Sequence, residues 1–97
     1  MKTVYKYNLP LDDYVKIVMP KGAEIISVGE QEQKLVIWAI VDSTAIEHRN
    51  RSFRIAGTGH PLSRNLSNGP DEKLLFIGTV QHSNGLVWHV FEVMNNN

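Results

Sequence analysis

The apolar residues of this chain fall into short segments, and each segment ends at turn-forming residues. Apolar and polar residues alternate within several of them, which is typical of half-buried β-strands rather than of helices. The pattern predicts an all-β fold, either a small sandwich or a partly open barrel, with little or no helix. We expect about seven short, mostly antiparallel strands at residues 3–9, 14–19, 23–29, 34–42, 52–57, 74–81 and 86–93.

Turn residues and apolar runs indicate how these strands are arranged. Pro20-Lys21-Gly22 predicts a hairpin between residues 14–19 and 23–29, and Asn84-Gly85 predicts a second one between the last two strands. The unbroken apolar run around Trp38 predicts a central strand that is buried on both faces. In residues 52–57, Phe53 and Ile55 alternate with polar or small residues, so one face of this strand should be wet.

Two polar stretches are not assigned to strands. Residues 43–51 are expected to form either one helical turn, capped by Ser43 or Thr44, or a loop. Residues 61–73 are rich in Ser, Asn, Gly and Pro, which predicts an excursion across the surface. Residues 1–97 should therefore form a single compact β domain, with residues 95–97 as a frayed tail.

Composition excludes several classes of protein. The chain has no cysteine, so disulfides and thiolate zinc sites cannot stabilise it. Ten basic residues balance ten acidic ones, which argues against binding to long nucleic acids. The N-terminus lacks the apolar region of a signal peptide, and the apolar run 35–41 is far shorter than the roughly 20 residues of a membrane-spanning helix. We expect a cytoplasmic protein without a membrane partner.

The loop Gly57-Thr58-Gly59-His60 is the best candidate for a ligand site. Its glycines would let backbone N–H groups approach a phosphate, while Thr58 could add a hydroxyl and Arg54 a positive charge. The spacing matches neither the P-loop nor the dinucleotide-binding fingerprint. The alternative is that this loop is only a forced exit from a strand, in which glycines adopt unusual φ angles.

Histidines and hydroxyl residues give little support to metal or enzyme chemistry. The four histidines have no metal-ligand spacing, so we expect no metal site and no cofactor. His60 could act as a base toward Thr58, Ser63 or Ser67, but no motif joins these residues. The sequence therefore predicts a protein that is not an enzyme.

Aromatic and basic residues suggest a second way to hold a nucleotide. Most aromatic rings of a small β domain belong to its core, but Trp38 or Trp88 could stack on a base. Arg54, Arg49 or Arg51 could then meet phosphate. Residues 48–51 (HRNR) are the densest positive cluster, and a solvated turn is the alternative interpretation.

Four stretches resemble a family of small uncharacterised bacteriophage proteins: MPKGAEIISV, the tryptophan strand that ends at Asp42, the GTGHPL loop and the terminal VWHVFE. The likeness covers nearly the whole chain, with residues 63–73 outside it. The resemblance implies a phage origin, a compact β fold and a place in the host cytoplasm. The family carries no settled activity, so the resemblance implies no catalytic residues.

Small phage proteins without enzymatic motifs often act by binding. Our first hypothesis is a sponge that sequesters a nucleotide immune second messenger, either a cyclic nucleotide or an ADP-ribose-derived ligand. Such a site would lie at the interface of a homo-oligomer. The alternative is a phage structural or host-directed protein-interaction module that uses sheet edges or an apolar patch. A hydrolase of such a nucleotide is a third, weaker option. The ligand site predicted for the sponge comprises Arg54, Gly57, Thr58, Gly59, His60, Trp38 and Trp88.

Overall fold

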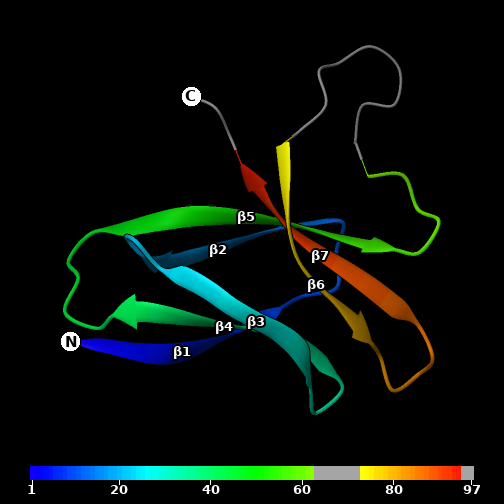
Figure 1. Cartoon of the computed structure of the whole chain (residues 1–97), viewed down its shortest axis with the longest axis horizontal. Helices are drawn as coiled ribbons and strands as arrows, with labels where there is room; N and C mark the ends of the chain where they lie inside the picture. The colour runs from blue at the N-terminus through cyan, green and yellow to red at the C-terminus, as the bar shows by residue number, and fades with distance from the viewer. Residues whose placement is uncertain (63–72, 95–97) are drawn as a thin grey trace.

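A computed structural model describes residues 1–62 and 73–94, which form seven antiparallel strands with no helix among them (Figure 1). The all-β prediction is therefore confirmed. The strands are β1 (Lys2–Leu9), β2 (Tyr14–Pro20), β3 (Glu24–Gln31), β4 (Lys34–Asp42), β5 (His48–Gly57), β6 (Lys73–Gln81) and β7 (Val87–Met94). The predicted excursion at residues 63–72 and the predicted tail at 95–97 lie outside the described residues.

The strands form two sheets with the orders β1-β4-β3 and β2-β5-β7-β6. The predicted hairpin of β2 with β3 is wrong, because β2 pairs with β5 and β3 pairs with β4. The turn between them closes as the Ala23 N–H donates to the Pro20 carbonyl over 3.1 Å. Met19 and Ala23, on either side of this turn, are both buried. The turn thus carries the chain from one sheet to the other across the edge of the core.

Two real hairpins join neighbouring strands. The hairpin of β6 with β7 was predicted correctly, and Gly85 in its turn has a φ of 92°. The hairpin of β3 with β4 turns at Glu32 and Gln33, whose φ angles are 54° and 66°. Positive φ at both central residues is the geometry of a type I′ turn, which normally selects Asn and Gly. The strand expected at residues 23–29 thus extends to Gln31, and two residues join it to β4.

The N-terminal half of β5 was not predicted as a strand. Residues 48–51 continue the ladder with β2, from the pair His48 and Pro20 to the pair Arg51 and Ile17. Residues 43–47 form a turn, and the side chain that stabilises it is Asp42 rather than Ser43 or Thr44. Its Oδ1 accepts hydrogen bonds from the Thr44 N–H (3.0 Å) and hydroxyl (2.7 Å).

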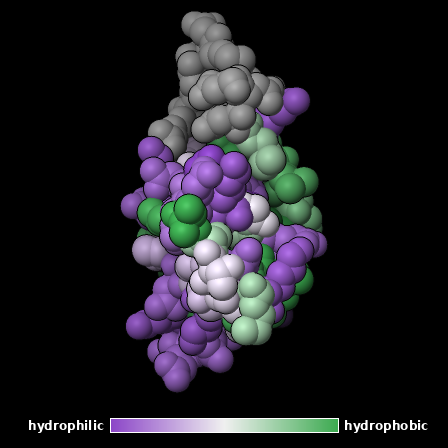
Figure 2. All heavy atoms as spheres, turned by 90° about the vertical axis from the view of Figure 1, so that its left-hand side faces the viewer, coloured by the Kyte–Doolittle hydropathy of each residue, from purple (hydrophilic) through white to green (hydrophobic). Residues whose placement is uncertain are grey.

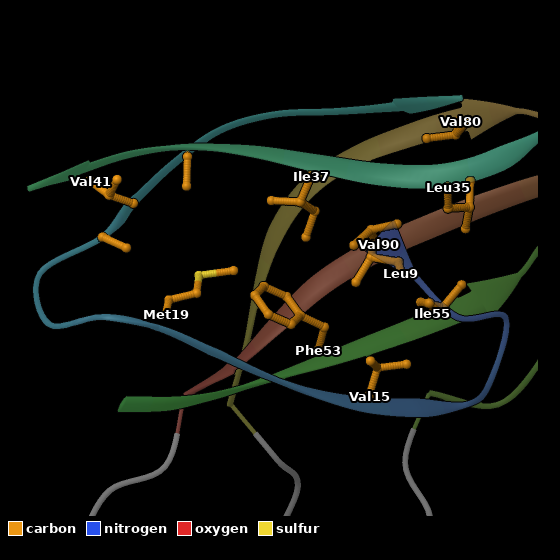
Figure 3. Close-up of a cluster of buried hydrophobic side chains, with 12 residues drawn as sticks. Leu9, Val15, Met19, Leu35, Ile37, Val41, Phe53, Ile55, Val80 and Val90 are labelled. Carbon is orange, nitrogen blue, oxygen red and sulfur yellow. The ribbon is translucent and has the colours of Figure 1, made fainter. Parts of the chain in front are cut away.

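The core lies between the two sheets (Figure 3). Ile37 and Leu35 enter it from β4, and Met19, Phe53 and Val90 enter it from the other sheet. As predicted, β4 is a central strand. Residues 35, 37, 39 and 41 on its core face are buried, but on its other face Trp38 and Ile40 are only partly buried, so burial on both faces holds only in part. The predicted wet face of β5 is dry at its C-terminal end, because Arg54 and Ala56 are 4% and 1% exposed.

Contacts between the strand edges close the molecule at one end. A Cβ on Gly78 of β6 would lie 2.7 Å from Val28 Cγ1 of β3, so the two strands touch here. Beyond this point the turns of the two hairpins are linked, because the Ser83 N–H and hydroxyl donate to Glu30 Oε2 over 2.9 Å each. The opposite halves of β3 and β6 have no ladder between them in the described sheets and diverge in Figure 1.

The face at the left of Figure 1 is largely polar, with single apolar side chains between polar ones (Figure 2). Among the described residues, no helix is long and apolar enough to cross a bilayer.

Candidate functional site

The Gly57–His60 loop is a tight exit from β5. The His60 N–H donates to the Gly57 carbonyl over 3.0 Å, and Gly59 has a φ of 90°. The Gly57 N–H in turn donates to His60 Nδ1 over 3.3 Å. A Cβ on Gly57 would lie 2.8 Å from the His60 ring, so glycine leaves the space that the imidazole occupies. The loop therefore needs glycine, as the sequence suggested: Gly59 for its positive φ and Gly57 for the space beside His60.

A cavity of about 260 Å³ lies beside this loop, at the end of β7 where Trp88 sits. The rings of His60 and Trp88 meet edge to face, with 6.5 Å between their centroids. Trp88 Nε1 is buried and has no hydrogen-bond partner among the described residues. Two of the other side chains at the cavity are carboxylates, so its mouth is acidic. The lining residues are Leu11, Asp12, Asp13, Ile55, His60 and Trp88.

Arg54 lies beneath the loop and is 4% exposed. Its Nε donates to the Leu62 carbonyl (3.0 Å), and its Nη2 donates to the Pro61 carbonyl (2.6 Å). Its Nη1 donates to the carbonyls of Asp13 (3.1 Å) and Ile55 and lies 3.5 Å from the Asp13 carboxylate. The guanidinium also lies 5.3 Å from the centre of the Tyr14 ring. These contacts give Arg54 a structural role, because a phosphate could reach it only by displacing the loop.

Thr58 faces away from the cavity and contacts His89. Its Oγ1 lies 2.8 Å from His89 Nε2, and Thr79 Oγ1 lies 3.0 Å from His89 Nδ1. The sequence analysis missed this group, because only the register of β5, β7 and β6 brings these residues together. The Thr58–His89 distance is that of a nucleophile and base, but neither residue lines the cavity beside Trp88.

Trp38 belongs to a different surface. It lies in β4, where it pairs with Lys6 of β1 and Ser27 of β3, on the face of that sheet that points away from the core. A Cβ on Gly29 would lie 3.2 Å from the Trp38 ring, so the indole covers this glycine. Of the predicted site, the structure brings Gly57, His60 and Trp88 together, with Gly59 in the same loop. It separates Trp38 from them, turns Thr58 away and uses Arg54 as a support.

A larger cavity of about 550 Å³ lies where β3 and β6 diverge. We call it the β3/β6 groove. Both strands have a β-bulge here, between Ile25 and Ser27 and between Phe76 and Gly78. Large apolar side chains at the groove are strongly exposed: Ile26 by 48%, Leu75 by 54%, Phe76 by 57% and Met94 by 44%. The remaining lining residues are Gly22, Ala23, Glu24, Ile25, Arg51, Ile77 and Glu92.

An ion pair between Arg51 and Glu92 forms the polar part of the groove. Arg51 Nη2 donates to Glu92 Oε1 over 2.9 Å, its Nε donates to Oε2, and its Nη1 donates to the Ala23 carbonyl over 2.8 Å. The hydrogen bonds with Glu92 raise the pKa of Arg51. Both side chains are mostly buried, so the pair adds specific contacts without adding net charge.

Sequence reasoning missed the groove because its two strands are distant in the chain. The one signal was the apolar run at residues 74–77, which is unusual for an edge strand. The turn expected at residues 48–51 is wrong, because these residues belong to strand β5, and solvent exposure differs between the two arginines of this stretch. Arg49 is half exposed and pairs with Glu47, whereas Arg51 points inward from the β5 strand.

Among the described residues, no group of three or more His, Cys, Asp or Glu side chains is placed to hold a metal ion. No curated protein and no solved structure shows significant similarity to the chain. One family model matches all of it, from residue 1 to residue 97, and the chain therefore belongs to the family described as a domain of unknown function, DUF7352.

Proposed function

We propose that this protein is a protein-interaction module without enzymatic chemistry, and that it binds an apolar segment of a partner in the β3/β6 groove. The observation that carries this proposal is the set of large apolar side chains left exposed around one cavity: Ile26, Leu75, Phe76 and Met94. Single exposed apolar residues are common on protein surfaces, but a cluster around a cavity is typical of an interaction site.

The strands beside the groove also supply backbone groups for binding. β3 and β6 are both edge strands, so each has a row of N–H and C=O groups outside its own sheet. An extended segment could pair with such an edge while its side chains enter the cavity. Burial of one Leu or Phe side chain contributes about 1.5–3 kcal/mol, and association costs about 4–15 kcal/mol. Several apolar contacts must therefore act together with the backbone hydrogen bonds of the paired edge.

The resemblance to small bacteriophage proteins supplies the biological setting for this proposal. In that setting the module is either part of the phage particle or directed at a host protein. Both roles need a specific protein surface and neither needs a catalytic group. The neutral net charge of the chain, with ten basic and ten acidic residues, agrees with recognition that rests on apolar contacts.

Selection of peptides from a random display library against the full chain tests the proposal. We expect the selected peptides to share apolar residues and to lose at least tenfold in affinity toward the variants Phe76→Asp and Leu75→Asp. The control variant is Val18→Asp, because Val18 is 58% exposed on β2, the other edge of the same sheet. Peptides that bind all of these variants equally well would refute the groove as the binding surface.

The cavity beside Trp88 favours a second candidate, the sequestration of a nucleotide immune messenger. Two rings, of His60 and Trp88, are available to contact a base, and Trp88 Nε1 lacks a hydrogen-bond partner among the described residues. Asp12 weakens this candidate because it would repel phosphate, whereas the Asp13 carboxylate lies 3.5 Å from Arg54 Nη1. The cavity volume of about 260 Å³ is also below the roughly 300–1,000 Å³ of most ligand sites.

A thermal-shift screen against cyclic dinucleotides, cyclic trinucleotides and cyclic ADP-ribose isomers tests the second candidate. A sponge would be stabilised by one ligand, would release it intact and would lose the shift in the variant Trp88→Leu. An absence of any shift across the panel would eliminate it. Consumption of the ligand would instead indicate a hydrolase.

A further inference from the structure

The four edge strands of the two sheets differ in how they are protected from pairing with another chain. Natural edge strands usually carry charges, proline or bulges that discourage such pairing. β1 carries Lys2 and Lys6, β2 ends at Pro20, and β3 carries Glu24 and Glu30. β6 begins with Lys73 and has a bulge between Phe76 and Gly78, but its half that diverges from β3 also holds a run of four apolar residues, Leu74 to Ile77.

The apolar character of this run extends to both faces of the sheet. Leu75 pairs with Glu92 on one face, whereas Leu74 pairs with Val93 and Phe76 with Phe91 on the other. Leu75 and Phe76 both line the groove. The rings of Phe76 and Phe91 meet edge to face with 5.6 Å between their centroids. A partner strand that matches this edge must therefore be apolar on both of its faces as well. The β6 strand of another copy has this property.

Symmetry and charge both permit β6 to pair with itself. Two antiparallel edge strands related by a two-fold axis form a closed, isologous contact. Directly opposed residues of an antiparallel pair point to the same face of the sheet. The two-fold axis must therefore lie at a residue that is paired with the same residue of the other copy. Lys73 is the charged residue of β6. If the axis lies at Leu74, Leu75 or Phe76, Lys73 is paired with an uncharged residue of the other copy and not with the other Lys73.

The overall charge removes a further obstacle, because ten basic and ten acidic residues leave no net repulsion between copies. From these observations we infer that the partner at the β3/β6 groove is a second copy of this chain, joined by antiparallel pairing of the β6 strands at residues 74–76. The two β2-β5-β7-β6 sheets then form one continuous sheet, and Leu75 of each copy lies against the β6 strand of the other copy beside the groove. This inference rests on the proposed use of the groove for protein binding.

Cysteine cross-linking tests the inference sharply, because the natural chain has no cysteine. We would introduce Leu74→Cys, Leu75→Cys and Phe76→Cys separately into the full chain. Opposed residues of an antiparallel pair have Cα atoms about 4.5–5.5 Å apart, which suits a disulfide. One of these variants should become a covalent dimer under mild oxidation. The control Val18→Cys, with a similarly exposed residue on the β2 edge, should stay monomeric.

Sedimentation equilibrium of the natural chain supplies the second measurement. We expect twice the mass of the chain, loss of the dimer in Leu75→Glu, and dissociation of the dimer by a saturating apolar peptide from the display selection. A monomer whose groove binds such peptides would overturn the inference and leave the proposed function standing. Cross-linking through Val18→Cys alone would overturn it too, since the dimer would then use another edge. A monomer that binds no peptide would refute both.

Discussion

Replacement of Arg54 by methionine should destabilise the fold strongly, because this side chain holds the loop after β5 to the rest of the sheet. Four backbone carbonyls, of Asp13, Ile55, Pro61 and Leu62, accept its hydrogen bonds, and the Asp13 carboxylate lies 3.5 Å away. Methionine fills most of the volume but satisfies none of the carbonyls. Each buried acceptor left unpaired costs about 1–3 kcal/mol.

Solvent can hydrate some of these carbonyls after the substitution, because Pro61 and Leu62 are exposed residues. The Asp13 carbonyl keeps the Ile55 N–H as a donor over 3.1 Å, whereas the Ile55 carbonyl belongs to a residue that is 2% exposed. We therefore expect a loss of about 3 kcal/mol in the free energy of unfolding, which is within the range for broken buried pairs. With a urea m-value of about 1–3 kcal/mol/M, the unfolding midpoint should fall by about 1–3 M.

Urea unfolding followed by tryptophan fluorescence measures this shift. The matched control is Arg49→Met on the same strand, because Arg49 is half exposed and its partners are the exposed Glu47 and the carbonyl of the neighbouring His48. Its midpoint should change little, since exposed ion pairs contribute about 0–1 kcal/mol. A similar midpoint for Arg54→Met and Arg49→Met would refute the structural role of Arg54.

Three further perturbations test other parts of the structure. Glu32→Asn combined with Gln33→Gly should raise the free energy of unfolding by about 1 kcal/mol, because Asn and Gly adopt the positive φ angles of 54° and 66° more readily than Glu and Gln. Calorimetry measures the gain. Gly78→Ala should lower the free energy of unfolding by about 1–3 kcal/mol, because the new Cβ would lie 2.7 Å from Val28 Cγ1. Adding Val28→Ala should restore part of this loss, as measured by urea unfolding. Hydrogen bonds from Ser83 lower the pKa of Glu30 below its ordinary 4.5, so this contact stabilises the fold above that pH and is lost as pH falls through the folded-state pKa. Glu30→Gln should therefore reduce the dependence of Tm on pH below about 4.5, and an unchanged Tm–pH profile would contradict this reasoning.

Strand content could be predicted from the sequence because it depends on local alternation and on turn residues. The central position of β4 followed from its unbroken apolar run, and the β6–β7 hairpin followed from Asn84-Gly85. The strand pairing of β2 could not be predicted from Pro20-Lys21-Gly22, because the same residues can close a hairpin or carry the chain between sheets. Burial of the residues before and after the turn in the core decides whether the turn closes a hairpin or carries the chain between sheets.

The candidate sites were less predictable, because each depends on contacts between distant strands. The loop Gly57–His60 and its need for glycine could be inferred from local sequence, and Trp88 does lie beside it. The sequence could not show that Arg54 is enclosed by carbonyls or that Trp38 lies on the other sheet. The β3/β6 groove arises only when two bulged strands from different sheets diverge.

Amide hydrogen exchange across residues 74–77 reports whether the free edge of β6 becomes paired. We expect the protection of these amides to rise with protein concentration, while amides on the β2 edge keep a constant rate. Exchange at residues 74–77 that stays fast at every concentration, and that no apolar peptide slows, would contradict this expectation.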